Sequence, residues 1–296
     1  LCEIGKVERK EAIIVDVPSD VYQQIAAKAV RYALISVGFT YNRMEKEVIM
    51  TRIENIAKGK IAEGLFSYYC ESVDIGPDFD ACTTPFWMPD QRDFLWYDGE
   101  WDIKNNFITC SDSDFDTLDF TSLPALIPNK FDGDQWSKRN DQYHKKSRYT
   151  AYLFTFMRLK PDDKKFVKIF LTEDQLKFIA DTGTRLGPAY HGRMPFEESW
   201  FFEQLNERGG AYRYSLSYYP EFIITASANA RYWSLFENTS VHDESVYQNY
   251  GSSPWYHKSD TILRFLNGIL VTRIRNKTCP VALLPAFSMI VEKYKA

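Results

Sequence analysis

The chain has few of the residues and motifs that build common metal, disulfide and nucleotide sites. Its five cysteines are scattered and odd in number, and no Cys-x-x-Cys pair occurs, which argues against a zinc site and a disulfide framework. The four histidines are too dispersed for a His-x-x-x-His metal pair. Because a glycine-rich phosphate loop, a dinucleotide fingerprint and a Gly-x-Ser-x-Gly motif are all missing, nucleotide-driven work and serine hydrolysis are not expected.

Long apolar runs and a strong charge bias are also missing. No run approaches membrane-spanning length, and the first residues do not resemble a signal peptide, so we expect a soluble, intracellular protein with no membrane partner. The net charge of −4 over 296 residues is not that of a nonspecific nucleic-acid coat. An acidic chain can still bind nucleic acid through a local basic groove.

What the chain does contain is a predicted β-hairpin between Arg92 and Asn106. An apolar run, Phe94 to Tyr97, is followed by Asp98-Gly99 and then by a run, Trp101 to Lys104, in which polar and apolar residues alternate. We place the turn at Asp98-Gly99, because the central residues of a tight hairpin turn need positive φ and Asp-Gly supplies it.

The predicted hairpin gathers charged side chains. Asp93 starts the first strand and can come close to the second, where the two-residue period places Asp102 and Lys104 on one face and Ile103 on the other. Two carboxylates and the Ile103 carbonyl are oxygen ligands that suit a hard divalent cation. The alternative is an edge hairpin whose charges form cross-strand ion pairs worth roughly a few tenths of a kcal/mol each.

An Asp on one strand and Asp102-Ile103-Lys104 on the next resembles the core motif of the PD-(D/E)XK nuclease superfamily. The resemblance covers roughly residues 41–171 and is interrupted by a long insert. It implies that Asp93, Asp102 and Lys104 are catalytic, and that Asp93, Asp102 and the Ile103 carbonyl bind Mg²⁺, with Mn²⁺ able to substitute. The bare acid-x-Lys tripeptide also occurs in polar stretches, as Glu8-Arg9-Lys10 and within Asp162 to Lys165, where a solvated charge cluster explains it better.

Many members of that superfamily carry a Glu on the preceding helix. Glu63 fits this place, which implies that it is both catalytic and a metal ligand. It shares a helix face with Lys60 and Ser67 and not with Ile61, so a solvated Glu63 remains the alternative. The proline of the family pattern is missing, because Arg92 precedes the first Asp.

The predicted fold is α/β, with a central mixed β-sheet flanked by helices, a restriction-endonuclease-like core and a C-terminal extension. Besides the hairpin, residues 149–157 and 166–171 are expected to supply strands of this sheet, the first buried on both faces. A helix from Ser19 or Asp20 to Leu34 is expected to bury a face made of Val21, Ile25, Ala29 and Tyr32. Thr172 to Gln175 reads as a capping box that opens another helix.

The chain divides into three predicted segments. Residues 1–40 form an N-terminal helical segment, residues 41–212 the nuclease-like core, and residues 213–296 a C-terminal extension or recognition subdomain. Within the core, an acidic insert at about 111–133 has loop character. Its acidic residues do not form a calcium loop, because the glycine of the turn and the bidentate Glu are missing.

The densest basic and aromatic run, residues 142–149, leads into the predicted strand after the hairpin. We expect it to contact the phosphate backbone of DNA through five side chains, namely Tyr143, His144, Lys145, Lys146 and Arg148. The alternative is a solvated basic turn that balances the acidic insert.

Together these features predict a metal-dependent endonuclease that hydrolyses DNA phosphodiester bonds, with a homodimer left open. By similarity to the family, the product would carry a 5′ phosphate. One alternative is the same fold with a weakened metal site, serving as a nucleic-acid-binding or interaction module. Another is a carbohydrate-active protein that uses the abundant Tyr and Trp, although Lys104 would then have no role.

Overall fold

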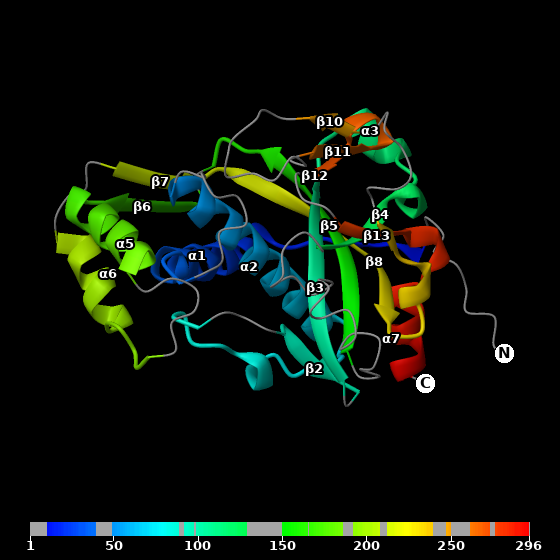
Figure 1. Cartoon of the computed structure of the whole chain (residues 1–296), viewed down its shortest axis with the longest axis horizontal. Coiled ribbons are helices and arrows are strands. Elements are labelled where there is room, and N and C mark those ends of the chain that lie inside the picture. The colour runs from blue at the N-terminus through cyan, green and yellow to red at the C-terminus, as the bar shows by residue number, and fades with distance from the viewer. Residues whose placement is uncertain are drawn as a thin grey trace.

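The computed structural model of the chain combines one large sheet, two small sheets and several helices (Figure 1). The described residues are 11–39, 49–88, 92–97, 99–128, 150–164, 166–185, 192–207, 212–238, 247–249, 261–272 and 276–295. Within them the α-helices are α1 (Ser19–Ser36), α2 (Ile49–Ser72), α3 (Asp112–Thr117), α5 (Glu173–Arg185), α6 (Glu198–Glu207) and α7 (Phe287–Lys295). None of these helices is long and apolar enough to cross a membrane.

The strands of the described residues divide among three sheets. Eight belong to the large sheet: β1 (Ile13–Val15), β2 (Phe94–Trp96), β3 (Gly99–Ile108), β5 (Thr150–Pro161), β8 (Tyr218–Asn229), β10 (Tyr247–Asn249), β11 (Thr261–Phe265) and β12 (Leu270–Thr272). A second sheet contains β4 (Pro124–Pro128), β9 (Glu237–Asn238) and β13 (Asn276–Pro280). The third pairs β6 (Val167–Leu171) with β7 (Tyr212–Leu216).

The large sheet has the order β1-β8-β5-β3-β12-β11-β10, with β2 paired to β3. Strands β3 and β5 run parallel, whereas the other neighbouring pairs are antiparallel. The sheet is therefore mixed and flanked by helices, as the sequence predicts. Strands from the N-terminal and C-terminal segments, β1 and β8, lie in the same sheet as the hairpin.

Strand β5 lies at the centre of two hydrophobic layers. All residues from Thr150 to Arg158 are buried, which confirms the predicted burial on both faces. Leu153 and Met157 belong to the cluster that includes α1 and α2, while Tyr152 and Phe154 belong to the cluster on the other side of the sheet. The alternation of side chains along a strand produces this division.

Helix α1 exposes part of the face that was predicted to be buried. Its buried residues are Tyr22, Ala26, Ala29, Val30, Ala33, Leu34, Ile35 and Ser36. Small side chains let α1 approach α2 closely, and a Cβ added at Gly64 of α2 would lie 2.6 Å from Ile25 Cγ2. Of the predicted face, Ala29 is buried, whereas Val21, Ile25 and Tyr32 are partly buried and pack against the core from its margin. No side chain caps α1 either, because its N-cap residue is Pro18 and not Ser19 or Asp20.

The acidic insert is more regular than predicted. It contains α3, a 3₁₀ turn (Phe120–Ser122) and β4, while residues 129–133 lie outside the described residues. Arg158 of β5 is buried and anchors this segment, because its guanidinium donates to the Ser111 carbonyl at 2.9 Å and to the Asp112 carboxylate at 2.8 Å. The loop prediction failed because this partner is distant in sequence.

Two further elements bear on the sequence predictions. The strand predicted at 166–171 exists as β6, but it pairs with β7 and does not join the large sheet. The capping box is confirmed, since the Thr172 N–H donates to Gln175 Oε1 at 2.8 Å and the Gln175 N–H donates to Thr172 Oγ1 at 3.2 Å. A local signal thus fixed the start of α5, whereas long-range pairing decided the sheet to which β6 belongs.

Candidate active site

The hairpin is present, with its turn one residue earlier than predicted. Trp96 pairs with Gly99, so Gly99 is a strand residue and the turn lies between them. Tyr97 takes the positive φ, 51°, and Asp98 lies outside the described residues. Packing sets this register: Phe94 stacks on Trp101 with ring centroids 5.7 Å apart, and both rings are buried. A shift of one residue would turn the strand's aromatic side chains to the other face.

Asp93 extends the hairpin by one step beyond β2. Its backbone N–H donates to the Trp101 carbonyl at 2.9 Å, and its carboxylate accepts from the Ile103 N–H at 2.5 Å. Continuing the register from the Phe94–Trp101 pair places Asp93 across from Asp102. The first acid of the predicted site therefore lies beside the second strand, where the sequence placed it.

Asp102 and Lys104 share one face of β3, and their side chains form an ion pair with each other. Their carboxylate and ammonium lie next to Tyr152 of β5, whose ring centroid is 5.6 Å from Lys104 Nζ. Trp101 and Ile103 point the other way, toward the cluster that contains α2. The predicted alternation along this strand is confirmed.

Glu63 reaches the hairpin from α2, which packs against the Trp101 and Ile103 face of the sheet. Its carboxylate pairs with Lys60 Nζ at 2.8 Å. Glu63 and Asp93 line one cavity of about 480 Å³. Glu63 thus faces the hairpin, but it approaches from the side of the sheet opposite to Asp102 and Lys104.

The Asp93 carboxyl is close enough to the carboxylates of Glu63 and Asp102 for both charges to change its pKa. Burial raises the pKa of the Asp93 carboxyl well above its ordinary value, and the negative charges of Glu63 and then Asp102 raise it further. The hydrogen bond from the Ile103 N–H and the Lys104 ammonium oppose this rise. Ionised Asp93 is therefore costly unless a further positive charge comes close to it.

The residues present match a divalent cation in chemistry but are not gathered around one point. Among the described residues, no group of three or more His, Cys, Asp and Glu side chains is placed to hold a metal ion. The pleat of β3 and the position of α2 keep Asp102 and Glu63 on opposite faces. The donors are nonetheless carboxylates, and the Ile103 carbonyl points to the edge that Asp93 occupies, because the N–H and C=O of one strand residue share a side.

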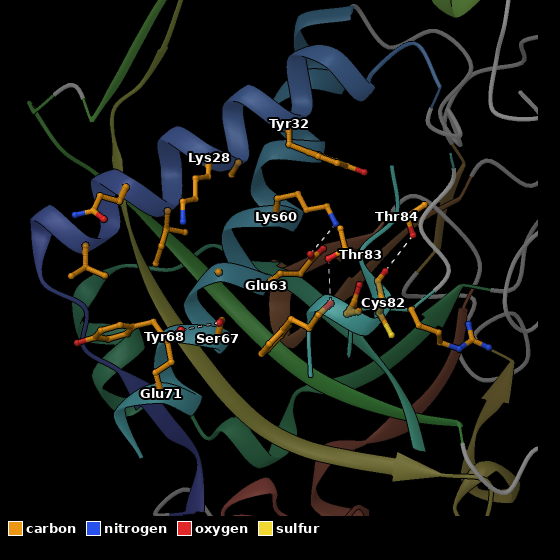
Figure 2. Close-up of a pocket in the computed structure, with 18 residues that line it drawn as sticks. Lys28, Tyr32, Lys60, Glu63, Ser67, Tyr68, Glu71, Cys82, Thr83 and Thr84 are labelled. Carbon is orange, nitrogen blue, oxygen red and sulfur yellow. Dashed lines mark hydrogen bonds and ion pairs between the residues drawn. The ribbon is translucent and has the colours of Figure 1, made fainter. Parts of the chain in front are cut away.

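The cavity beside Asp93 contains residues that the sequence did not mark (Figure 2). Helix α1 contributes Lys28 and Tyr32, and α2 contributes Lys60 beside Glu63. The segment at Thr83 closes the opposite side. Helical spacing had placed Glu63 on one face with Lys60 and Ser67, but it gave no sign that this face would line a cavity with Lys28 and Thr83.

The predicted DNA-contacting residues, Tyr143, His144, Lys145, Lys146 and Arg148, lie outside the described residues. Thr150, which follows this run, pairs with Glu100 of β3. The strand that begins at Thr150 therefore lies beside β3 in the sheet, with Tyr152 paired to Asp102.

Comparisons with family models, with curated proteins and with solved structures found no match to this chain.

Proposed function

We propose that the protein is a metal-dependent endonuclease with a restriction-endonuclease-like core, which hydrolyses DNA phosphodiester bonds. The observation that carries the proposal is Asp93, held at the edge of the hairpin by the Ile103 N–H, with the charges of Glu63 and Asp102 both raising its pKa. Carboxylates that repel one another in a partly buried site are expected where a cation is to be bound.

Asp93, Asp102 and the Ile103 carbonyl would hold Mg²⁺, with Glu63 joining directly or through water. When bound, Mg²⁺ would lower the pKa of a water molecule that it coordinates and would neutralise negative charge on the phosphate. Lys104 would stabilise the negative charge that develops on the phosphate oxygens. The oxygen of the attacking water bonds to phosphorus and loses a proton, the bond from phosphorus to the 3′ oxygen breaks, and that oxygen takes up a proton. The products are a 5′ phosphate and a 3′ hydroxyl.

This proposal requires the side chains to move. Asp102 is paired with Lys104 and Glu63 with Lys60, on opposite faces of the sheet. A divalent cation at Asp93 would compete with both lysines for these carboxylates. Convergence needs Glu63 and Asp102 to change rotamer, so that each carboxylate leaves its lysine and turns toward Asp93.

A nucleic-acid-binding or interaction module with a weakened metal site is the second candidate. The specific observation in its favour is that the described acids do not form a group able to hold a metal ion. In that case the lysine pairs of Glu63 and Asp102 would be permanent. The protein would then bind DNA without cutting it.

A plasmid-nicking assay separates the two candidates. Purified protein with Mg²⁺ or Mn²⁺ should nick supercoiled DNA, EDTA should stop the reaction, and both Asp93→Ala and Asp102→Ala should abolish it. Asp163→Ala is the matched control, since Asp163 is an exposed acid in another copy of the acid-x-Lys tripeptide. Metal-independent binding with no cleavage would support the module instead, and full activity in either site variant would show that the site is elsewhere.

A further inference from the structure

The cavity between α1, α2 and the segment around Thr83 has the composition of a binding site. Its wall on α1 includes the apolar side chains of Val21, Ile25 and Ala29, most of the face that periodicity assigned to the core, together with polar Gln24 and Lys28. Aromatic rings of Tyr32, Tyr68 and Phe79 lie around it. A volume of about 480 Å³ falls within the range of small-ligand pockets.

The cavity also holds cations that an anionic ligand could use. Lys28 is exposed and forms no hydrogen bond or ion pair with any residue in the part of the chain that the structure describes. Lys28 lines the cavity from α1, and Lys60 and Glu63 line it from α2 (Figure 2). The Lys60 ammonium pairs with Glu63 and lies 4.8 Å from the Tyr32 ring centroid. One cation is thus available at the rim, and a second is placed beside an aromatic ring.

Acidic residues of the cavity are concentrated where a metal-bound phosphate would lie. Asp93 and Glu63 belong to the proposed catalytic site. Glu71 lies further along α2, where its carboxylate accepts a hydrogen bond from Ser67 at 3.4 Å. A nucleotide needs three kinds of contact, and the cavity offers each of them. The acids at Asp93 would take the metal-bound phosphate, the aromatic rings would stack on the base, and the Lys28 ammonium would pair with a further phosphate oxygen.

We propose that this cavity binds one unpaired nucleotide of the DNA strand that is cut, next to the scissile phosphate. The inference rests on the proposed nuclease function, because Asp93 and Glu63 are shared. A base in a duplex is covered by its partner and its stacked neighbours, so it enters such a pocket only from a single strand or after being flipped out. The protein should therefore prefer single-stranded DNA, flaps or frayed ends to intact duplex.

Cysteine protection tests occupancy of the cavity without requiring cleavage. Cys82 lines the cavity, and Cys110 lies elsewhere; both are partly exposed, and burial raises the pKa of both thiols. The protein is treated with N-ethylmaleimide in Mg²⁺ and separately in EDTA, for a time shorter than cleavage takes, with a single-stranded oligonucleotide, the blunt duplex of the same sequence, or a deoxynucleoside monophosphate. Labelling of each cysteine is then read by peptide mass.

We expect the single strand to slow labelling of Cys82 by about tenfold relative to Cys110, and the duplex to have little effect. Equal protection by single strand and duplex would overturn the preference for an unpaired nucleotide. Protection by the monophosphate but not by the oligonucleotide would make the ligand a free nucleotide and overturn its assignment to a strand. Unchanged labelling with all three would overturn the cavity as a nucleotide site.

A filling substitution with a matched control gives an independent readout. Thr83 is exposed and its hydroxyl donates to the carbonyl four residues earlier, as Thr117 on α3 also does. Thr83→Trp should weaken single-strand binding, measured by fluorescence anisotropy, by about tenfold, the loss of one base-stacking contact. Thr117→Trp should leave it unchanged. Equal affinities of the two variants would overturn the proposal.

These outcomes are separable from the failure of the nuclease proposal. If the protein nicks plasmid but no ligand protects Cys82, the nuclease proposal stands and the cavity has no role in binding the nucleotide. Protection of Cys82 by single strands in a protein that cuts no DNA would support the nucleotide site and remove the catalytic role.

Discussion

The carboxylate of Asp93 accepts a hydrogen bond from the backbone N–H of Ile103, the residue between Asp102 and Lys104. This bond holds an acid at the open end of the β2–β3 ladder, in the field of Glu63 from one face of the sheet and of Asp102 from the other. The cost of ionising Asp93 links the chemistry of the site to the stability of the fold.

Replacing Asp93 by Asn should stabilise the protein at high pH while abolishing cleavage. The folded-state pKa of Asp93 is raised, so the folded protein holds this proton more tightly than the unfolded chain does. The free energy of unfolding of the wild type should therefore fall as pH rises from about 4 through the folded-state pKa. Asn removes the ionisation and keeps an oxygen for the Ile103 N–H.

Urea unfolding at several pH values measures this effect. Asp93→Asn should exceed the wild type by on the order of 1–3 kcal/mol at pH 8, and the difference should shrink toward pH 4. A variant less stable than the wild type at pH 8 would show that the ionised carboxylate is favoured in the fold and that its pKa is not raised.

Divalent cations should stabilise the wild type through Asp93 and Asp102. A cation that binds the folded protein at 100 times its Kd adds about 2.7 kcal/mol to the free energy of unfolding. Thermal melts with and without Mn²⁺ should show a rise in Tm for the wild type and little for Asp93→Asn or Asp102→Ala. An equal rise in all three proteins would place the cation elsewhere.

Glu63→Gln should change the pH dependence of cleavage as well as its rate. The charge of Glu63 raises the pKa of Asp93, so its removal lowers that pKa and should move the acidic limb of the pH–rate profile to lower pH. The plateau rate should fall roughly 10–100-fold, as for other residues that support a metal site. Glu54→Gln is the control and should alter neither quantity, because Glu54 lies on the same helix and also pairs with a lysine but is not among the residues that line the cavity. A profile that moves equally in both variants would remove Glu63 from the site.

Lys104 and Lys60 each pair with an acid of the site, Asp102 and Glu63 respectively, and their variants should differ. Lys104→Ala should lower the cleavage rate by roughly 10²–10³, the loss of a group that stabilises charge in the transition state. Lys60→Ala should cost no more than about tenfold, because it removes the partner of Glu63 and a cation of the cavity and not the group assigned to the scissile phosphate. The opposite ranking would assign the role to Lys60, which shares the cavity with Asp93.

Lys145 and Lys146 lie outside the described residues, and their predicted role stays open to a salt titration. Replacing both by Ala should weaken DNA binding for all sequences. It should also flatten the slope of log K against log salt by up to about one for each lost phosphate contact. An unchanged slope would place the DNA groove elsewhere in the chain.

Local physical chemistry determined several elements from the sequence alone. The alternation after the turn fixed Asp102 and Lys104 on one face of β3, and the reciprocal bonds of Thr172 and Gln175 fixed the start of α5. The helical period also placed Glu63 on a polar face shared with Lys60. Each of these depends on residues only a few positions apart, which sequence spacing reports directly.

Only the tertiary structure decided which of these faces meet. Periodicity identified an apolar stripe on α1, but Val21, Ile25 and Tyr32 of this stripe are only partly buried, so they pack against the core and also line a cavity. The spacing of Asp102 and Glu63 gave no sign that they would approach from opposite sides of the sheet. The spacing of residues in the sequence predicts which side chains share a face of a helix or strand. The burial and the partners of that face depend on segments, distant in sequence, that pack against it.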